Sequence, residues 1–285
     1  MNNYSGFLII DKEAGLTSQS VDILIKKKFN IRKVGHLGTL DPFATGLLII
    51  GLLEGTKFLP LFKDEKKTYV ATLSLGKETD SLDLTGNIVS EKEVPALTEE
   101  KIKDVLYSFI GKQKQQVPTY SAKHINGERS YVLLRKGIDF IPPTVDIEVK
   151  EMKLLSFTSN MITFETTVSK GTYIRSLGRD IAYRLNTVGH LTSLRRTKVD
   201  DIDLSHAKRV DEISDSDIIT IPSMFNDIPV IEGNEAIAKR AIAGNNIYYK
   251  SEKEHLFFAK DNELIALYKK DREGHYICQR GIRHD

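Results

Sequence analysis

One acidic side chain stands in a tightly constrained loop of this sequence, KVGHLGTLDPFATGLL, which runs from Lys33 to Leu48. Asp41 is the only carboxylate in the loop, and its neighbours include the helix-breaking residues Gly35, Gly38, Pro42 and Gly46. An aspartate in such a place can cap a helix, form an Asx turn, bind a metal or act on a substrate.

The residue patterns of several common sites are absent. The seven histidines form no HxH or HxxxH pair and Cys278 is the only cysteine, so we predict no metal site. No GxSxG segment indicates a serine hydrolase, and no Walker loop or GxGxxG segment indicates a nucleotide, so we also predict no nucleotide cofactor. Asp80 and Asp83 are three residues apart, which does not match a DxD pattern for phosphoryl transfer.

A lone carboxylate suits chemistry at the C1′ carbon of a sugar, where positive charge develops as a glycosidic bond breaks. A glycosidase generally needs a second carboxylic acid to protonate the leaving group, and this loop offers Asp41 alone. An isomerase that returns the same base to the same sugar needs no hydrolytic water. The residues leave both a base isomerase and a nucleoside glycosylase or hydrolase open, and release of free base distinguishes them.

The segment GHLGTLDPFATGLL resembles the signature of the TruB family of tRNA pseudouridine synthases, with Asp41 at the position of the catalytic aspartate. Other segments resemble family motifs in the same order along the chain: GFLIIDKEAGLTS at the start, KTYVATLSLGKETDSLDLTG (67–86), VPTYSAKHINGERSYVLLRKG (117–137), VSKGTYIRSLGRDI (168–181) and GHLTSLRRTKV (189–199). The ATGLL that follows DPF resembles the bacterial branch of the family rather than the branch that uses guide RNA.

The chain departs from the family pattern in three places. Glu13 stands where a proline is usual, and Val168 stands where cysteine is frequent. The segment 117–137, which resembles the family's RNA-gripping insertion, is one residue short and carries Lys123-His124 where an apolar residue and a lysine are common. None of these departures touches the loop of Asp41, but the last bears on how the insertion grips tRNA.

The resemblance implies an enzyme that converts uridine-55 in the T loop of tRNA to pseudouridine without a metal or cofactor. The base must be flipped out of the folded loop, detached from C1′, turned and rejoined through C5. Asp41 would be the essential carboxylate, either attacking C1′ or removing a proton from C2′. Arg175 would pair with Asp41, and Tyr69 would stack on the uracil and is a candidate base for the C5 proton.

The resemblance also implies substrate contacts from His36, Tyr173, Leu194 and Lys12. Ordinary structural roles remain open: Tyr69 and Leu194 can be core residues, His36 can be structural, Lys12 can be solvated, and Arg175 can bind phosphate or form a surface ion pair. Asp83 is predicted to form a turn and to have no catalytic role.

Charge is unevenly distributed along the chain, although the net charge is only +2. Between Lys170 and Lys198, Asp180 is the only acid among several Lys and Arg residues. A second basic run with no acid lies between Asp22 and Asp41 and contains Lys26, Lys27, Lys28, Arg32 and Lys33. Such runs are either solvated faces or surfaces for a polyanion. With the resemblance, we predict RNA binding by Arg129, Arg135, Lys136, Lys170, Arg195 and Arg196.

Hydrophobic periodicity predicts the elements that position these residues. Strands are expected at Gly6–Lys12, Leu47–Leu53, Lys67–Gly76, Ile147–Leu155 and Met161–Ser169. One helix is expected to start at a Ser18 cap and to bury Val21, Leu24, Ile25 and Phe29. A second helix follows a Thr98 cap, buries Ile102, Val105, Leu106, Phe109 and Ile110, and ends at Gly111, and a third spans Tyr173–Leu185.

Strands and helices alternate without a regular βαβ pattern, so we predict an α+β fold. The resemblance specifies a mixed, mainly antiparallel sheet of the pseudouridine synthase type in residues 1–225, with the RNA-gripping insertion at about 117–145. Pro222 and Pro229 bracket a predicted linker. Residues 230–285, with a helix around Glu235–Ala243 and a hairpin turning at Asp261-Asn262, occupy the place of a small RNA-binding, PUA-like domain.

No apolar run reaches the ~18–20 residues of a membrane span, and no signal peptide is recognisable. Cys278 is the only cysteine and is expected to be a small core residue, so no intrachain disulfide can form. A cytoplasmic protein is therefore expected. The resemblance implies the T arm of tRNA as the partner, no membrane, no guide RNA or protein partner, and a monomer. A rival reading is a non-catalytic tRNA-binding or RNA-folding module, which would be expected if Asp41, Tyr69 or Arg175 were missing.

Overall fold

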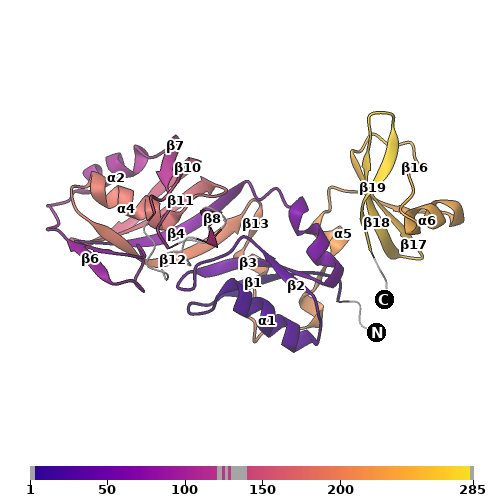
Figure 1. Cartoon of the computed structure of the whole chain (residues 1–285), viewed down its shortest axis with the longest axis horizontal. Helices are drawn as coiled ribbons and strands as arrows, with labels where there is room; N and C mark the ends of the chain where they lie inside the picture. The colour runs from indigo at the N-terminus through magenta and orange to yellow at the C-terminus, as the bar shows by residue number, and fades with distance from the viewer. Residues whose placement is uncertain (1–3, 121–123, 126–127, 130–139, 283–285) are drawn as a thin grey trace.

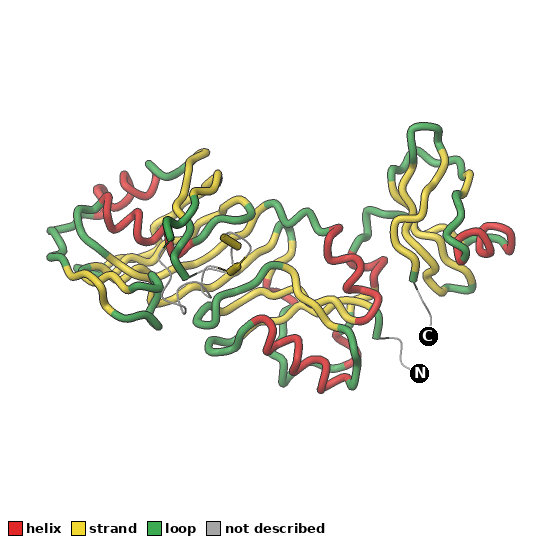
Figure 2. Tube along the Cα trace, viewed as in Figure 1, coloured by secondary structure: helices red, strands yellow, loops and turns green. Residues whose placement is uncertain are grey.

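The computed structural model describes residues 4–120, 124–125, 128–129 and 140–282. The molecule is elongated, with a large sheet that carries helices and a small domain at one end formed by the C-terminal residues (Figure 1). Both parts are built around β-sheets (Figure 2).

The large sheet has ten strands in the order β14-β1-β3-β12-β4-β11-β10-β7, with β13 paired to β12 and β2 paired to β3. Its pairings are antiparallel except for a short parallel contact between β12 and β3. This confirms the predicted mixed, mainly antiparallel sheet. The strands are β1 (Gly6–Lys12), β2 (Val34–Leu37), β3 (Thr45–Leu52), β4 (Lys66–Leu75), β7 (Gly111–Gln116), β10 (Thr144–Phe157), β11 (Met161–Ser169), β12 (Gly189–Val199), β13 (Ile202–Asp203) and β14 (Ile219–Thr220).

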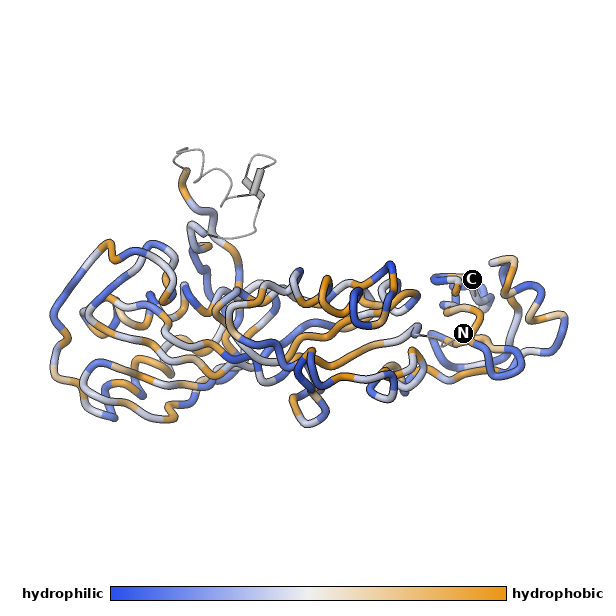
Figure 3. The backbone as a smooth tube through the Cα atoms, turned by 90° about the horizontal axis from the view of Figure 1, so that it is seen from below, coloured by the Kyte–Doolittle hydropathy of each residue, from blue (hydrophilic) through white to orange (hydrophobic). Residues whose placement is uncertain are grey.

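Strand β4 shows why the sequence pattern was informative. Its alternate residues Tyr69, Ala71, Leu73 and Leu75 are buried in the main core, as their period of two predicts. Strands β1 and β3 are apolar on both faces because each face packs against a separate hydrophobic cluster. Apolar segments therefore follow the strands in Figure 3, and hydrophilic segments follow the turns.

Among the described elements, the helices that cover the large sheet are α1 (Ser18–Phe29), α2 (Glu99–Tyr107) and α4 (Ile174–Arg184). Thr98 caps α2 as predicted, and α4 buries the apolar residues Ile174, Leu177 and Ile181. The predicted Ser18 cap is wrong, because Thr17 caps α1 by accepting a hydrogen bond from the Ser20 N–H. Leu24 and Ile110, both predicted to be inward, are exposed.

The helix α2 ends at Tyr107, four residues before the predicted Gly111, which instead starts β7. Short elements complete this part of the chain: the 3₁₀ helices η1 (Leu53–Leu61), η2 (Leu204–His206) and η3 (Asp215–Asp217), the hairpin strands β5 (Lys77–Thr79) and β6 (Ile88–Glu91), the strands β8 (His124–Ile125) and β9 (Glu128–Arg129), and α5 (Ile221–Met224).

The C-terminal domain is a five-stranded sheet in the order β15-β17-β18-β19-β16 with one helix, α6. The predicted hairpin joins β17 to β18, and both Asp261 and Asn262 adopt the left-handed backbone that such a tight turn requires. Cys278 is half-buried and packs against this domain's core, as predicted. The elements are β15 (Val230–Glu232), α6 (Glu235–Ile242), β16 (Ile247–Tyr248), β17 (His255–Lys260), β18 (Glu263–Lys270) and β19 (His275–Gly281).

A shared hydrophobic cluster joins the two parts. Phe7 of β1 and Phe58 of η1 meet Phe225, which follows α5, and Phe257 of the C-terminal sheet packs 6.0 Å from Phe58, ring centroid to ring centroid. The predicted linker is therefore partly ordered into a short helix and packed between the parts. None of the described helices is long and apolar enough to cross a membrane.

Candidate active site

The loop that carries Asp41 connects β2 to β3 and is held in place from beneath by side chains of distant segments. The buried Ser18 Oγ accepts a hydrogen bond from the Leu40 N–H at 3.0 Å. Arg196 Nη2 donates to the Gly38 carbonyl at 2.9 Å. Gly38 has φ +67° and lies against Arg196 and Lys67, so a side chain at this position would be strained.

Asp41 and Arg175 form a bidentate ion pair. Arg175 Nε donates to Asp41 Oδ2 and Arg175 Nη2 donates to Asp41 Oδ1, each at 3.0 Å. The Arg175 side chain is 6% exposed, whereas the Asp41 side chain is 36% exposed. A buried, planar guanidinium thus fixes the orientation of a carboxylate that remains accessible from outside.

Helix α4 positions Arg175, and a buried amide fixes the start of this helix. Gln115 of β7 accepts a hydrogen bond from the Tyr173 N–H at 2.8 Å and donates to the Tyr173 carbonyl at 3.1 Å. Tyr173 is half-buried at the N-cap of α4, two residues before Arg175. Gln115 was not identified from the sequence, and no motif singled it out.

The rest of the Arg175 guanidinium is also bound. Nη1 donates to the Ser81 carbonyl at 2.7 Å, and Nη2 also donates to the Tyr120 carbonyl at 3.0 Å. Asp83 Oδ2 lies 3.6 Å from Nη1. The other oxygen of Asp83 accepts hydrogen bonds from Ser81 and Thr85, which confirms the predicted turn. Asp83 is thus a second carboxylate that faces Arg175, a contact that the sequence reading missed.

Tyr69 lies opposite Arg196 in the pairing of β4 with β12, and Leu194 of β12 lies opposite Ala71. Tyr69 and Leu194 are both buried. Burial raises the pKa of the Tyr69 phenol, although the neighbouring Arg196 guanidinium opposes this shift. The phenol is therefore neutral at physiological pH.

His36 is held between α1 and the loop. Its Nδ1 lies 2.8 Å from Asp22 Oδ2 of α1, and its Nε2 lies 3.3 Å from Thr39 Oγ1. The ring is partly exposed. His36 thus lies in the β2 strand that leads into the loop, with both nitrogens already engaged.

Lys12 does not occupy the predicted position of a substrate contact. Its side chain is 1% exposed, and its ammonium donates to the carbonyls of Leu16, Glu13 and Pro42 at 2.6, 2.9 and 3.3 Å. Burial lowers its pKa from 10.5 to about 8, partly offset by the negative charge of Asp41. Lys12 therefore supports the loop from inside the protein.

The predicted RNA-binding cations differ in what the structure allows. Arg196 is 1% exposed and bound to the Leu47 and Gly38 carbonyls, so it cannot reach a phosphate on the surface. Arg195 is half-exposed and forms a bidentate pair with Asp11 at 2.6 and 3.0 Å. Lys170 is exposed and lies 2.9 Å from Asp64. Nothing is described of the Arg129 side chain, and Arg135 and Lys136 lie outside the described residues.

Asp64 is the centre of a charged cluster beneath Tyr69 and Arg196. Its two oxygens lie 2.7 Å from Lys67 Nζ and 2.9 Å from Lys170 Nζ. Burial opposes ionisation of this carboxyl, but hydrogen bonds from the two lysines outweigh burial and lower the pKa of Asp64. Burial also lowers the pKa of Lys67. The cluster was not identified from the sequence, because Lys170 comes from a segment far along the chain from Asp64 and Lys67.

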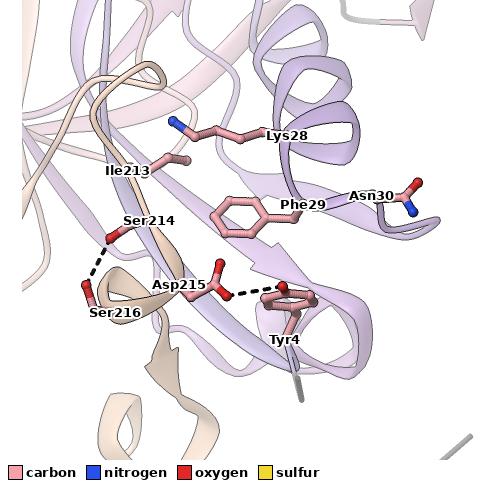
Figure 4. Close-up of a pocket in the computed structure, with 8 residues that line it drawn as sticks. All are labelled: Tyr4, Lys28, Phe29, Asn30, Ile213, Ser214, Asp215 and Ser216. Carbon is pink, nitrogen blue, oxygen red and sulfur yellow. Dashed lines mark hydrogen bonds between the residues drawn. The ribbon is translucent and has the colours of Figure 1, made fainter. Parts of the chain in front are cut away.

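Two other features of the described surface lie away from Asp41. A shallow hollow of about 740 Å³ is lined by residues of the end of α1 and of η3, and none of the predicted site residues lines it (Figure 4). Asp271, Glu273 and His275 bring together potential metal-binding atoms on the C-terminal domain. The predicted chemistry depends on neither feature.

The site therefore combines one accessible, oriented carboxylate with a buried aromatic ring and several fixed positive charges. Asp41 can act as a nucleophile or a base toward a sugar, since Arg175 keeps its two oxygens in a fixed direction. Tyr69 is close enough to Asp41 for the carboxylate charge to act on its phenol, and Leu194 lies on the neighbouring strand β12.

Residues 26–174 match the family described as TruB family pseudouridylate synthase (N terminal domain). The chain is 39% identical over 251 residues to tRNA pseudouridine synthase B of Caldicellulosiruptor saccharolyticus, and the match covers 88% of this chain and 86% of that protein. It is 33% identical over 283 residues to tRNA pseudouridine synthase B of Mesoplasma florum, with 98% of each chain covered.

Solved structures show the same fold. A chain in the structure of an H/ACA RNP bound to a substrate RNA containing 2′-deoxyuridine has a TM-score of 0.69 at 20% identity, and the match covers 99% of this chain and 86% of that chain. A chain in the crystal structure of a Cbf5-Nop10-Gar1 complex has a TM-score of 0.69 at 22% identity, with 99% and 85% covered. The likeness therefore extends over both parts of the molecule.

Proposed function

Because this chain belongs to the TruB family of pseudouridylate synthases, we propose that it is a tRNA pseudouridine synthase that acts on uridine-55 of the T loop. The observation that carries the proposal is the accessible Asp41 carboxylate held by two hydrogen bonds from the buried Arg175. The relatives are named for activity on tRNA, and nearly the whole of each is covered.

Asp41 acts at the ribose in this proposal. It either attacks C1′, so that the C1′–N1 bond breaks and a covalent ester forms, or removes a proton from C2′ as the same bond breaks. In both routes the uracil stays in the pocket and turns so that C5 faces C1′. In the first route C5 displaces the Asp41 oxygen from C1′, and in the second Asp41 returns its proton to C2′ as the C1′–C5 bond forms. N1 takes up a proton, and the C5 proton leaves to water. The two hydrogen bonds from Arg175 keep the Asp41 carboxylate directed at the ribose.

Tyr69 is proposed to stack against the flipped uracil. Burial raises the pKa of its phenol, so the resting side chain is neutral and cannot take up the C5 proton without first giving away its own. The proposed role uses only the aromatic ring, and stacking of a base on an aromatic ring contributes ~1–3 kcal/mol. Leu194, Tyr173 and His36 complete the proposed pocket, whereas Lys12 and Arg196 support it from beneath.

The proposed domain boundaries follow the same assignment. Residues 1–225 form the catalytic domain with an RNA-gripping insertion at about 117–145, and residues 230–285 form the small RNA-binding domain. The enzyme is proposed to act on the T arm of tRNA without a guide RNA.

Release of tritium from a tRNA transcript labelled at uridine C5 tests the function, because forming the C1′–C5 bond must release that label. We expect release by the wild-type protein and none by Asp41→Asn, with tRNA binding retained by both. Chromatography of the same reaction detects free uracil, which would indicate a glycosylase. A folded wild-type protein that binds tRNA but releases no tritium would refute the proposed isomerisation and support a binding module.

A further inference from the structure

The two basic runs of the chain differ in how far their cations are buried or paired with acids. Of the predicted RNA-binding cations from the first run, Arg196 is buried, and Arg195 and Lys170 are each bound to a carboxylate. The second run has been given no role so far. It contains cations that form no ion pair with any acid in the described part of the chain. These are Lys26, Lys27, Arg32 and Lys33, which we name the α1–β2 basic patch.

The patch lies at the end of α1 and the start of β2. Lys27, Arg32 and Lys33 are exposed and Lys26 is half-buried. The Ile31 N–H donates to the Lys26 carbonyl at 3.0 Å, which turns the chain back toward β2. Lys28 is not part of the patch, because its ammonium donates to the Val210 and Asp211 carbonyls and it lines the hollow of Figure 4.

Contacts along α1 connect the patch to the site. Ser18 in the first turn binds Leu40 of the catalytic loop, and Asp22 in the next turn binds His36. Lys26 follows at the same spacing of four residues, so the three lie along one side of the helix. At a rise of ~1.5 Å per residue, the patch begins roughly 12–14 Å from the loop contact.

A uridine flipped toward Asp41 leaves its neighbouring nucleotides outside the pocket, and their phosphates carry one negative charge each. Cations that have no acidic partner in the protein are free to neutralise such phosphates and release the bound counterions. Lysines already paired to carboxylates gain less, because binding must first compete with the existing pair.

We propose that the α1–β2 basic patch binds the phosphate backbone of tRNA outside the flipped nucleotide and positions the T arm over Asp41. This inference rests on the proposed function, since it names a surface through which the same substrate is held. The contacts are to phosphates, so the patch supplies affinity and register without reading sequence.

The test compares two triple variants that each remove three positive charges. The first is Lys27→Ala, Arg32→Ala and Lys33→Ala. The control is Lys92→Ala, Lys101→Ala and Lys153→Ala, which are exposed cations from the β6, α2 and β10 region with no ion pair among the described residues. Thermal melts of both proteins establish that they fold, as expected for surface positions.

The dissociation constant for an unmodified tRNA transcript is measured across a salt series of about 50 to 200 mM, where phosphate contacts dominate the salt dependence. If each of the three cations meets one phosphate, the slope of log K against log salt falls by about 2–3 for the patch variant, at ~0.7–0.9 per contact. Affinity near physiological salt should weaken by roughly tenfold or more, while the control changes by less than about threefold.

A patch variant that matches the control in affinity and salt slope overturns the inference. Wild-type protein is assayed for tritium release in the same experiment. If the wild-type protein binds tRNA and releases no tritium, the proposed function fails. If the wild-type protein releases tritium but the patch variant binds tRNA as the control variant does, only this inference fails.

Discussion

The substitution Arg175→Lys tests whether the geometry of the guanidinium, rather than its charge, prepares Asp41 for reaction. Arginine donates two parallel hydrogen bonds to Asp41 and further bonds to the Ser81 and Tyr120 carbonyls. A lysine at this position keeps one positive charge but offers a single nitrogen. It cannot bind both Asp41 oxygens in one plane and reach the two carbonyls as well.

The magnitude follows from the bonds that are lost. The variant loses at least two bonds of a charged donor in a buried setting, each contributing about 1.5–3 kcal/mol, and the smaller side chain recovers part of this. We therefore expect a decrease of about 3 kcal/mol in the free energy of unfolding. Misorientation of Asp41 should lower kcat by about 100-fold or more, with a smaller change in KM.

Arg195→Lys is the matched control, because Arg195 also forms a bidentate pair, with Asp11, but on the surface. The two side chains are 39% and 29% exposed, and surface pairs contribute about 0–1 kcal/mol. Tritium release gives kcat and KM, and urea unfolding gives stability. If Arg175→Lys keeps kcat within about threefold of wild type, as the control should, the reasoning about orientation is wrong.

Three further predictions concern stability. The pKa of Lys12 is about 8 in the folded protein and 10.5 in the unfolded chain, so the unfolded state holds its proton more tightly between these values. The free energy of unfolding should therefore rise between pH 8 and 10.5, by up to ~3 kcal/mol. Urea titrations of wild type and Lys12→Met across a pH series isolate this contribution as the difference between the two proteins. Gly46→Ala should destabilise the protein by about 2–4 kcal/mol, because φ is +101° and a Cβ would lie 2.2 Å from a carbonyl oxygen of β12. The control Gly15→Ala, at φ +86° with open space around it, should lose only about 1 kcal/mol of stability in thermal unfolding. Asp64→Asn leaves a buried lysine without its counter-charge and should destabilise by about 3 kcal/mol, whereas Asp201→Asn, whose side chain is 96% exposed, should change stability by less than about 0.5 kcal/mol.

The sequence predicts the parts of the fold and site that depend on local pattern. The period of two placed Tyr69 inward on β4, and the loop motif together with the Arg175 motif identified a pair that the structure brings together. The family resemblance also implied the mixed, mainly antiparallel sheet, which the structure shows.

The burial of charged residues could not be predicted in the same way. Lys12 and Arg196 read as surface cations, because each lies among polar or charged neighbours in the sequence. Both are buried, and their nitrogens donate hydrogen bonds to carbonyls of other segments. These hydrogen bonds depend on how β1, β3 and β12 pair. The charge runs were equally ambiguous, since an ion pair such as Arg195 with Asp11 joins residues 184 apart in the chain.

The distance along the chain between the two halves of the site has a consequence for folding. Asp41 and Arg175 are 134 residues apart, and the loop of Asp41 is also anchored by Arg196 of β12. Closing so long a loop carries a large entropic barrier, and contacts of this kind form late. On the ribosome, the loop of Asp41 emerges long before the strand that holds it. Activity should therefore return later than secondary structure after dilution from denaturant. The return of activity then measures when the long-range contacts of Asp41 with Arg175 and of its loop with Arg196 have formed.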